Sequence, residues 1–460
     1  MRWAKKDVYD VTCYRHAGKG YAEGHRTIAF RERQCHFCLV SHPPMRVLVL
    51  NSGSSSLKVR GFEVCEGAFT DMGAYHPLLA GLVREIGDHA TMELHLAGGP
   101  TVMESKRIRT HREAVHWIFD KMTESFPFCA FSLHQIDAVG HRMVHGGDRY
   151  VGPTRVNETV LLELEKLGDL APLHNPACLE GIYGARERLG GQIPMVVVFD
   201  TAFYYTLPHV ARFYALPTEI AERHAIRRYG FHGIAHGALA ASYARGTGRE
   251  LTHVRLITLQ LGSGCSITAI EHGQAIDTSM GFSPLEGLMM STRSGDLDPT
   301  IVGYLAEREQ VDVAEVERWL NERSGLLGVS GRSGEMRALL QASLQEGDPR
   351  AQFAIDLFCY RARKYLGAYL AVLGGADAII FGGGIGEHAP EVRARICHGM
   401  EWCGLLLDAE RNRQIVHLAP GEIARISPDH TPITVYVGAT DEETWIARET
   451  MASLAPDSAV

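Results

Sequence analysis

Residues 48–59 read LVLNSGSSSLKV. One apolar run enters this stretch, a Gly/Ser cluster interrupts it, and a second apolar run leaves it, which predicts a β-hairpin with a tight turn. Gly53 lets the backbone approach a ligand closely, and the N–H groups, the Ser hydroxyls and Lys58 all suit phosphate oxygens. Asn51 adds a neutral oxygen that suits a magnesium ion or its waters. The alternative is an ordinary Gly/Ser hairpin, because short loop motifs also occur without a ligand.

The same pattern returns in the second half of the chain. Residues 255–270 read RLITLQLGSGCSITAI, again with an apolar strand, one amide side chain, a Gly/Ser turn and a second apolar strand. A repeated strand–turn–strand unit indicates a duplicated domain with a nucleotide between the two halves. The repeat is therefore more specific than either loop alone.

Composition narrows the class of protein. The chain has 460 residues, enough for two or more domains, with 45% hydrophobic and 22% charged residues. A net charge of −8 argues against a nucleic-acid-binding or anionic-membrane surface, and no apolar run approaches membrane-spanning length. The ten cysteines are scattered, which predicts a reducing, cytoplasmic environment and no disulfide framework.

Residues 1–44 are polar and basic and lack the continuous hydrophobic region of a secretory signal. Cys35 and Cys38 form one CxxC, which could bind zinc, although no second pair follows at zinc-finger spacing. We favour the alternative that Met45 is the natural start, because the first strand that could pack begins at Arg46. The extension is then disordered or an artefact of an upstream start, and we expect it to be dispensable for folding and activity.

Two later segments each hold a polar side chain in a stiff or glycine-rich setting. HRMVHGG (141–147) follows a predicted strand at 136–140, and its Arg142 could grip a carboxylate or phosphate through two hydrogen bonds. In APLHNP (171–176), two prolines stiffen the loop around His174. The alternatives are a surface arginine in a turn and a loop that only precedes the next helix.

Three further candidates lie in the middle of the chain. Asp200 follows the fully apolar strand 195–199, at the end of the strand where open α/β sheets bind ligands, although it could instead cap the next segment. His232 stands between glycines that leave its imidazole approachable, although a structural histidine is the default interpretation. Arg293 lies in the long loop 281–299, and a long loop inside a compact domain usually has a function.

The last candidates lie near the C-terminus. A strand at 376–381 runs into GGGIGE (382–387), a turn that could carry a nucleotide. The turn imitates a dinucleotide-binding fingerprint, which we discount because no βαβ unit clearly closes on it. After a strand at 434–437, Glu442 and its acidic neighbours open the terminal helix, where acidic residues also complement the helix dipole.

Hydrophobic periodicity predicts the remaining elements. Amphipathic helices are expected at 109–126, 313–323 and 351–372. The stretch after the hairpin, through Lys106, is by contrast polar and poorly patterned.

The chain resembles the acetate kinase family from about Met45 to Thr450, because eight motifs occur in the family's order. They are NSGSSSLK, GHRMVHGG, APLHNP, VVFDTAF, YGFHG, MGFSPLEG, TRSGDLDP and GGGIGEH. The resemblance implies an α/β fold of two duplicated ribonuclease-H-like domains (the actin-like ATPase fold), with the active site in a cleft between them, and a homodimer. It places the first domain at 45–200, completed by a C-terminal helix at 443–460, and the second domain at 201–442.

The resemblance also implies roles for individual residues. Five catalytic residues surround the acetate carboxylate and the transferring phosphoryl group: Arg142, His174, Asp200, His232 and Arg293. Beside Arg142, a small apolar pocket for the acyl methyl group consists of Val144, Leu173, Phe231 and Pro284. Two residues hold Mg²⁺, for which Mn²⁺ could substitute: Asn51 and Glu442. The positions that bind ATP or ADP are Ser54, Ser56, Lys58, Gln260, Leu261, Gly262, Ser263, Gly264, Glu335, Met336, Arg337, Gly384, Ile385, Gly386, Glu387 and His388.

These roles imply a reversible, magnesium-dependent transfer of the γ-phosphoryl group of ATP to acetate, which gives acetyl phosphate and ADP. The chemistry is coherent without the family, because an acetate oxygen can attack in line while two arginines, a histidine and magnesium stabilise the spreading negative charge. Acetate is already ionised at neutral pH, so positioning is enough and no general base is needed. Propionate is expected as a secondary substrate. The alternatives are a propionate or butyrate kinase, a paralogue with another donor such as pyrophosphate, and a non-catalytic nucleotide switch on the same fold.

The sequence departs from the family pattern on the nucleotide side. Gln260, Ser263 and Cys265 stand where the family commonly has His, Asn and Ser. Glu335 replaces a usual Asp, and His388 replaces a usual Asn. The acyl side is intact, so acetate as the acceptor follows more directly from the sequence than ATP as the donor.

Overall fold

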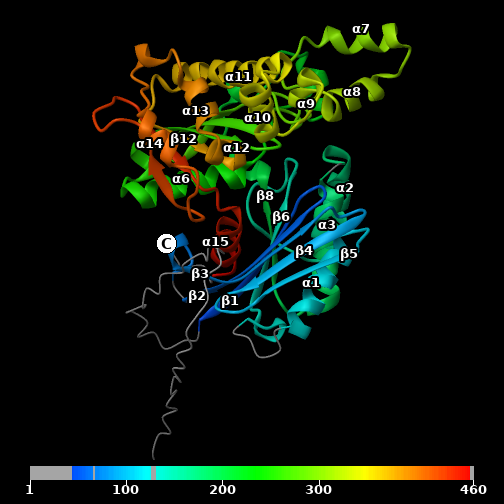
Figure 1. Ribbon diagram of the computed structural model, residues 1–460. Helices are drawn as coiled ribbons and strands as arrows, with labels where there is room; N and C mark the ends of the chain where they lie inside the picture. Colours follow the sequence, from blue (N-terminus) through cyan, green and yellow to red (C-terminus); the bar gives the residue numbers. More distant parts are fainter. Residues whose placement is uncertain (1–43, 66–67, 126–130, 173, 456–460) are drawn as a thin grey trace, which may run out of the picture. The chain divides into compact units, whose positions relative to one another are not determined.

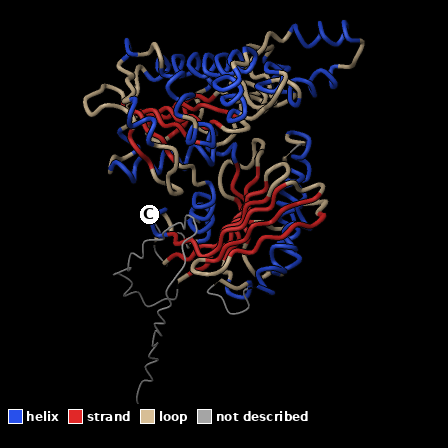
Figure 2. The backbone as a smooth tube through the Cα atoms, viewed as in Figure 1, coloured by secondary structure: helices blue, strands red, loops and turns tan. Residues whose placement is uncertain are grey.

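The computed structural model describes residues 44–65, 68–125, 131–172 and 174–455. These residues form two mixed β-sheets with helices packed against them, which confirms the predicted α/β class (Figures 1 and 2). Residues 1–43 of the predicted extension, with the possible zinc ligands Cys35 and Cys38, lie outside the described residues, and so does Leu173.

The first sheet is built around the hairpin at 48–59. Its strands are β1 (Met45–Ser52), β2 (Leu57–Val64), β3 (Tyr75–Arg84), β4 (His89–Leu96), β5 (Thr101–Arg107), β6 (Ala138–Met143), β7 (Thr154–Arg155) and β8 (Met195–Phe199). They lie in the order β5-β4-β3-β2-β1-β6-β8-β7. β1 pairs antiparallel with β2 and parallel with β6, which in turn pairs parallel with β8.

The second sheet repeats this arrangement. Its strands are β9 (Arg255–Leu261), β10 (Cys265–Glu271), β11 (Gln274–Thr278), β12 (Ala378–Gly382), β13 (Ile423–Arg425) and β14 (Thr434–Gly438). The order β11-β10-β9-β12-β14-β13 matches β3-β2-β1-β6-β8-β7 of the first sheet, strand for strand. Both sheets have an antiparallel hairpin beside two parallel strands and a short antiparallel edge strand. The topology therefore confirms the internal duplication that the two similar loops predict.

The polar, poorly patterned stretch that ends at Lys106 holds β3, β4 and most of β5. In β4, the buried residues Ala90, Met92 and Leu94 alternate with more exposed ones. This period of two is the signature of a strand with one buried face, but polar side chains on the other face obscured it.

The described chain also contains fifteen α-helices. They are α1 (His111–Ser125), α2 (Glu158–Lys166), α3 (Asn175–Leu189), α4 (His209–Arg212), α5 (Thr218–Arg223), α6 (Gly233–Thr247), α7 (Thr300–Glu309), α8 (Val313–Glu322), α9 (Gly325–Ser330), α10 (Met336–Glu346), α11 (Pro349–Leu373), α12 (Gly383–His388), α13 (Pro390–Cys397), α14 (Ala409–Gln414) and α15 (Glu442–Leu454). The three predicted helices are confirmed as α1, α8 and α11, within a few residues at each end. The last helix, α15, packs on the first sheet, where its Ile446 and Ala447 join the cluster around Val47 and Val49 of β1.

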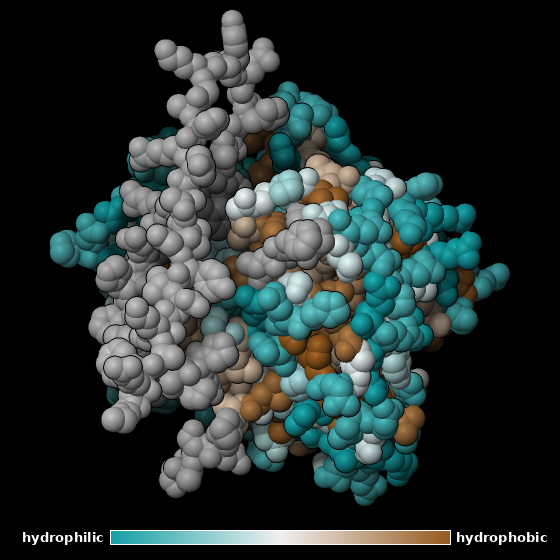
Figure 3. All heavy atoms as spheres, turned by 90° about the horizontal axis from the view of Figure 1, so that it is seen from below, coloured by the Kyte–Doolittle hydropathy of each residue, from teal (hydrophilic) through white to brown (hydrophobic). Residues whose placement is uncertain are grey.

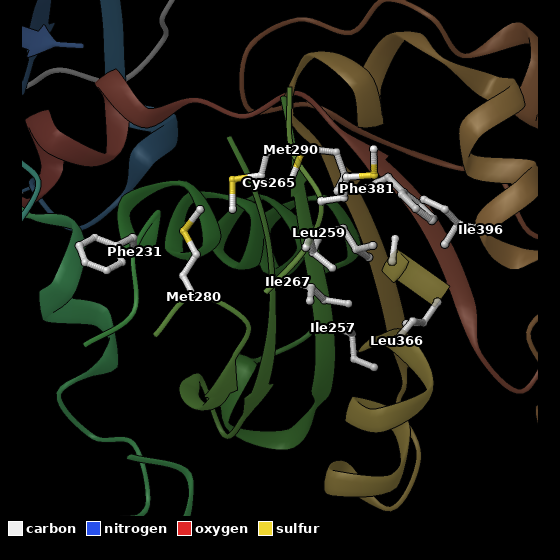
Figure 4. Packing of buried hydrophobic residues seen from close by; sticks show 14 of the residues in the cluster. Phe231, Ile257, Leu259, Cys265, Ile267, Met280, Met290, Leu366, Phe381 and Ile396 are labelled. Atoms are coloured by element: carbon white, nitrogen blue, oxygen red, sulfur yellow. The ribbon is translucent and has the colours of Figure 1, made fainter. Parts of the chain in front are cut away.

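The largest hydrophobic cluster lies between the second sheet and α11 (Figure 4). Ile257, Leu259 and Phe381 from the sheet pack with Leu366 of α11, and all four are 0% exposed. Fully burying one such side chain contributes about 1.5–3 kcal/mol. The cluster continues to Phe231, so the same core that holds the sheet also supports the predicted acyl pocket.

Hydrophobic and hydrophilic residues are mixed on the molecular surface. On the face shown in Figure 3, hydrophobic residues occupy small areas between hydrophilic ones. Among the helices of the described chain, none is both long and apolar enough to cross a membrane.

Candidate active site

The hairpin turn between β1 and β2 leaves its serines open to a ligand. Gly53 donates its N–H to the carbonyl of Ser56 at 2.8 Å, which closes the turn. A Cβ atom on Gly53 would lie 2.8 Å from the Oγ atom of Ser56, so a larger residue here would displace the Ser56 hydroxyl. Ser54 is exposed and Ser56 partly exposed, and Lys58 leaves the turn on the exposed face of β2.

The acidic start of α15 lies against this hairpin. The amide nitrogen of Asn51 donates to Glu442 and to Glu443, each at 2.8 Å. Lys58 forms an ion pair with Glu443 at 3.5 Å, and Glu443 raises the pKa of Lys58 above its usual value. Arg60 pairs with Asp441 at 2.9 Å. These acidic residues therefore join the last helix to the first hairpin, in addition to complementing the helix dipole.

Asn51 and Glu442 suit a magnesium ion that also binds phosphate. Burial favours the neutral form of Glu442, but Lys58 and Arg142 lower the pKa of its carboxyl below the usual value, so it is ionised. Within the described part of the chain, no cluster of three or more acidic, histidine or cysteine side chains could hold a metal by itself. Mg²⁺ commonly takes one or two carboxylates and completes its shell with water and phosphate oxygens, and the pair fits that pattern.

Arg142 and Asp200 form a buried ion pair between the ends of two parallel strands. Arg142 is the penultimate residue of β6, Asp200 directly follows β8, and the guanidinium donates to the carboxylate at 2.6, 3.2 and 3.3 Å. Burial raises the pKa of the Asp200 carboxyl, and the Arg142 guanidinium opposes that rise. Burial by itself would lower the pKa of Arg142, but Asp200 and Glu442 raise it above its usual value. The arginine is thus a fixed cation in the site.

His232 sits in a strained backbone conformation at the start of α6, with φ of +59°. A left-handed backbone is uncommon for a residue with a side chain and is concentrated at functional sites. The next residue, Gly233, packs against the carbonyl of Asp200, and any Cβ atom there would collide with it. This glycine is therefore required by packing, and not by access to the imidazole as the sequence suggested.

His232 and Arg293 converge on the second Gly/Ser turn, residues 262–264, which we call the phosphate loop. A Cβ atom built on Gly264 would lie 3.2 Å from Nε2 of His232 and 3.7 Å from a guanidinium nitrogen of Arg293. Arg293 also donates to the carbonyl of Pro284 at 3.0 Å. The structure thus brings both side chains to one side of the loop.

The histidines of the site are neutral. Burial lowers the pKa of His174 to about 4, and the nearby Arg142 and Arg293 contribute smaller shifts in the same direction. Burial and Arg142 lower the pKa of His232 to about 3. Because these histidines lie in the field of two arginines, a further positive charge on either ring is unfavourable.

Three of the predicted acyl-pocket residues lie close to these groups. Val144 and Phe231 belong to one buried cluster and are 4% and 1% exposed. Pro284 is tied to Arg293 through its carbonyl. The fourth, Leu173, lies outside the described residues.

A cavity of about 640 Å³ opens beside the phosphate loop. Eight of the predicted nucleotide-binding residues line it: Gly262, Ser263, Glu335, Met336, Arg337, Gly384, Ile385 and His388. Sequence reasoning missed six others, which are Ser291, Gly334, Leu340, Ala389, Val416 and His417. Five predicted residues do not line it: Gln260, Leu261, Gly264, Gly386 and Glu387. Ser54, Ser56 and Lys58 belong instead to the first hairpin.

The chain is similar to known proteins over most of its length. The family model described as the acetokinase family matches residues 46–448. The chain is 44% identical to an acetate kinase of Chloroherpeton thalassium and 45% identical to one of Solibacter usitatus, in each case over 88% of this chain and 98% of the relative. Among solved structures, it is similar to the acetate kinase of Porphyromonas gingivalis (TM-score 0.79, 38% identity, 89% of this chain and 100% of that one). A propionate kinase of Francisella tularensis has a TM-score of 0.78 at 33% identity, over 89% of this chain and 99% of that one.

Proposed function

The chain belongs to the acetokinase family, and from that premise we propose that it transfers the γ-phosphoryl group of ATP reversibly to acetate. The products are acetyl phosphate and ADP. The observation that carries this proposal is the convergence of Arg142, His232 and Arg293 on the region beside the phosphate loop. Two cations and a neutral hydrogen-bond donor match the charge that develops in phosphoryl transfer.

The protein contributes positioning and charge to the reaction. Arg142, oriented by Asp200, binds the carboxylate of acetate and faces the transferring group, and Arg293 neutralises the charge on the equatorial oxygens. His232 and His174 add hydrogen bonds without adding charge. Because the acetate oxygen is itself the nucleophile, the site needs alignment and no general base. Asn51 and Glu442 would hold Mg²⁺, which supplies Lewis-acid neutralisation of the phosphate oxygens.

The apolar pocket favours a short acyl group. Val144 and Phe231 are almost completely buried in a packed cluster, which leaves little freedom to accommodate a longer chain. Acetate is therefore the preferred acceptor, with propionate as a secondary one. The similarity to a protein named propionate kinase supports propionate as a further substrate.

A nucleotide is the preferred phosphoryl donor. The cavity of about 640 Å³ has both an apolar part, with Leu340, Ile385 and Val416, and polar residues beside the phosphate loop. Pyrophosphate, the alternative donor, has no base or ribose to fill such a space. The cavity therefore supports ATP.

The proposal also includes the domain boundaries, the cellular location and the oligomeric state. We place the two domains at 45–200, together with the C-terminal segment 443–460, and at 201–442. Among the described residues, the thiols of Cys178, Cys265, Cys359, Cys397 and Cys403 are not in disulfides, as expected in the cytoplasm. Large apolar side chains on the outer faces of α7 and α11, among them Tyr304, Phe353 and Tyr360, are 58–60% exposed and support a homodimer that covers them.

An acyl-phosphate assay with hydroxylamine trapping tests the proposal. The full chain is offered acetate, propionate or butyrate together with ATP, GTP or pyrophosphate, in the presence of Mg²⁺. We expect most product from acetate and ATP, and a severe loss of turnover in Arg142→Ala but not in the surface control Arg411→Ala. Folded protein that binds nucleotide and forms no product with any pair would refute kinase activity and favour a nucleotide switch.

A further inference from the structure

Three buried side chains extend from His232 in a continuous chain of hydrogen bonds. The Nδ1 atom of His232 lies 2.8 Å from Oγ of Ser266, and the same Oγ lies 2.8 Å from Nε2 of His236. The Nδ1 atom of His236 lies 2.6 Å from Oγ1 of Thr258. Ser266, His236 and Thr258 are each 0% exposed, so bulk water does not compete for these bonds.

Secondary structure brings the four residues together. His232 and His236 are four residues apart at the start of α6, which places them on one face of the helix. Thr258 of β9 and Ser266 of β10 belong to one antiparallel hairpin, in which Ser266 pairs with Gln260, two residues beyond Thr258. Side chains two apart on a strand share a face, so both hydroxyls point to the side of the hairpin that faces the histidines.

The direction of these hydrogen bonds follows from counting hydrogens. A serine hydroxyl has one hydrogen, and the partners of the Ser266 hydroxyl within the described chain are the two imidazoles. If Ser266 accepted from both rings, its own buried hydrogen would have no acceptor, so it donates to one imidazole and accepts from the other. Burial lowers the pKa of both histidines far below the usual value, so each ring carries only one N–H. The charged and titratable groups that face His232 are Arg142, Arg293, Glu442, His174 and His236. Only two arrangements of the chain are then possible.

The two arrangements differ at Thr258. In one, Thr258 donates to Nδ1 of His236, Nε2–H of His236 donates to Ser266, and Ser266 donates to Nδ1 of His232. In the reverse arrangement, the Thr258 hydroxyl would need a separate acceptor for its hydrogen. Within the described chain, its only hydrogen bond is the one with His236. A buried donor without an acceptor is costly, so the first arrangement is favoured.

We propose that Thr258, His236 and Ser266 are positioning residues that fix His232 as the tautomer with its hydrogen on Nε2. This nitrogen lies against Gly264 of the phosphate loop, next to Arg293. It is therefore placed to donate a neutral hydrogen bond to an oxygen of the transferring phosphoryl group. Without the chain of hydroxyls, the ring could place its hydrogen on either nitrogen and would donate only part of the time. The inference rests on the proposed phosphoryl transfer.

A matched pair of variants tests this role. Thr258→Val keeps the shape of the side chain and removes the hydroxyl, whereas Thr258→Ser keeps the hydroxyl and removes a methyl group. We expect kcat for acetyl phosphate formation to fall about 10-fold in Thr258→Val, with KM for acetate and ATP unchanged. In Thr258→Ser, kcat should stay close to the wild-type value. Equal kcat values in the two variants would overturn the proposal.

A second measurement does not depend on activity. In the full chain labelled with ¹⁵N-histidine, the His232 signals, assigned by their loss in His232→Asn, report which ring nitrogen carries hydrogen. We expect Nε2–H in the wild type and in Thr258→Ser, and a mixture of tautomers in Ser266→Ala. If the wild-type enzyme is active and carries the hydrogen of His232 on Nδ1, the proposal is overturned. Nε2–H in a protein that forms no acyl phosphate would support the tautomer assignment while refuting the proposed function.

Discussion

Replacing Asp200 by Asn tests whether the buried ion pair with Arg142 organises the site. The Asp200 carboxylate is 1% exposed and accepts from Arg142 at 2.6, 3.2 and 3.3 Å. Asn has the same size, but it carries no charge, and its NH₂ group would face the N–H donors of the guanidinium. At least one of these hydrogen bonds is therefore lost, and the arginine keeps its charge without its main partner.

Two magnitudes follow from this geometry. Removing one partner of a buried ion pair costs about 3–5 kcal/mol. Because Glu442 also stabilises the charge of Arg142, we expect the free energy of unfolding to fall by an amount at the lower end of that range, about 3 kcal/mol. For catalysis, misplacing one preorganised donor at the transition state lowers kcat by about 10²–10³-fold. KM for acetate should also rise, since Arg142 binds the carboxylate before the reaction.

Urea unfolding measures the stability, and hydroxylamine trapping measures kcat and KM. Asp429→Asn is the matched control, because Asp429 accepts from Arg411 at 2.7 and 3.1 Å on the surface and its side chain is 64% exposed. In this control we expect a loss below about 1 kcal/mol and unchanged kcat. The reasoning is refuted if Asp200→Asn keeps kcat within about 3-fold of the wild type, or loses no more stability than Asp429→Asn.

Three further predictions concern the acyl pocket, the metal and acid stability. Val144→Ala should raise kcat/KM for butyrate relative to acetate by about 10-fold, and an unchanged ratio would show that Val144 does not line the pocket. Glu442→Gln should raise the Mg²⁺ concentration for half-maximal activity at least about 10-fold, and an unaltered Mg²⁺ titration would exclude it as a ligand. Burial lowers the pKa of His141 to about 3 and of His145 to about 4, whereas an unfolded histidine titrates near 6.5. Protonation therefore favours the unfolded chain, so the free energy of unfolding should be level above about pH 6.5 and fall below it, by up to about 1.4 kcal/mol per pH unit for each histidine. Urea midpoints that stay constant from about pH 6.5 to 5 would contradict these assignments.

The duplication of the fold could be predicted from the sequence, because the repeat in sheet topology is accompanied by a repeat in the sequence. The loops at 48–59 and 255–270 look alike because each forms the hairpin of an equivalent sheet. The predicted residues of the candidate site were identified from sequence motifs, whereas the residues that surround them could not be identified in this way. Val416 and His417 line the cavity from a segment without any glycine motif. Thr258 and Ser266 read as ordinary strand residues, and only the packing of α6 on the β9–β10 hairpin gives their hydroxyls a partner.

Gln260 and Cys265, which depart from the family pattern in the phosphate-loop region, form hydrogen bonds within this region and to its neighbours. Gln260 accepts from the hydroxyl of Thr440 at 3.0 Å, and Thr440 in turn donates its N–H to Glu387 at 3.0 Å and accepts from Gly383 at 3.2 Å. Cys265 donates to the carbonyl of Gly262 at 3.2 Å, which closes the loop. These bonds connect the phosphate-loop region, the start of α12 and the segment before α15. A substituted loop that keeps such connections retains the shape needed to hold a nucleotide, which favours ATP over pyrophosphate as the donor.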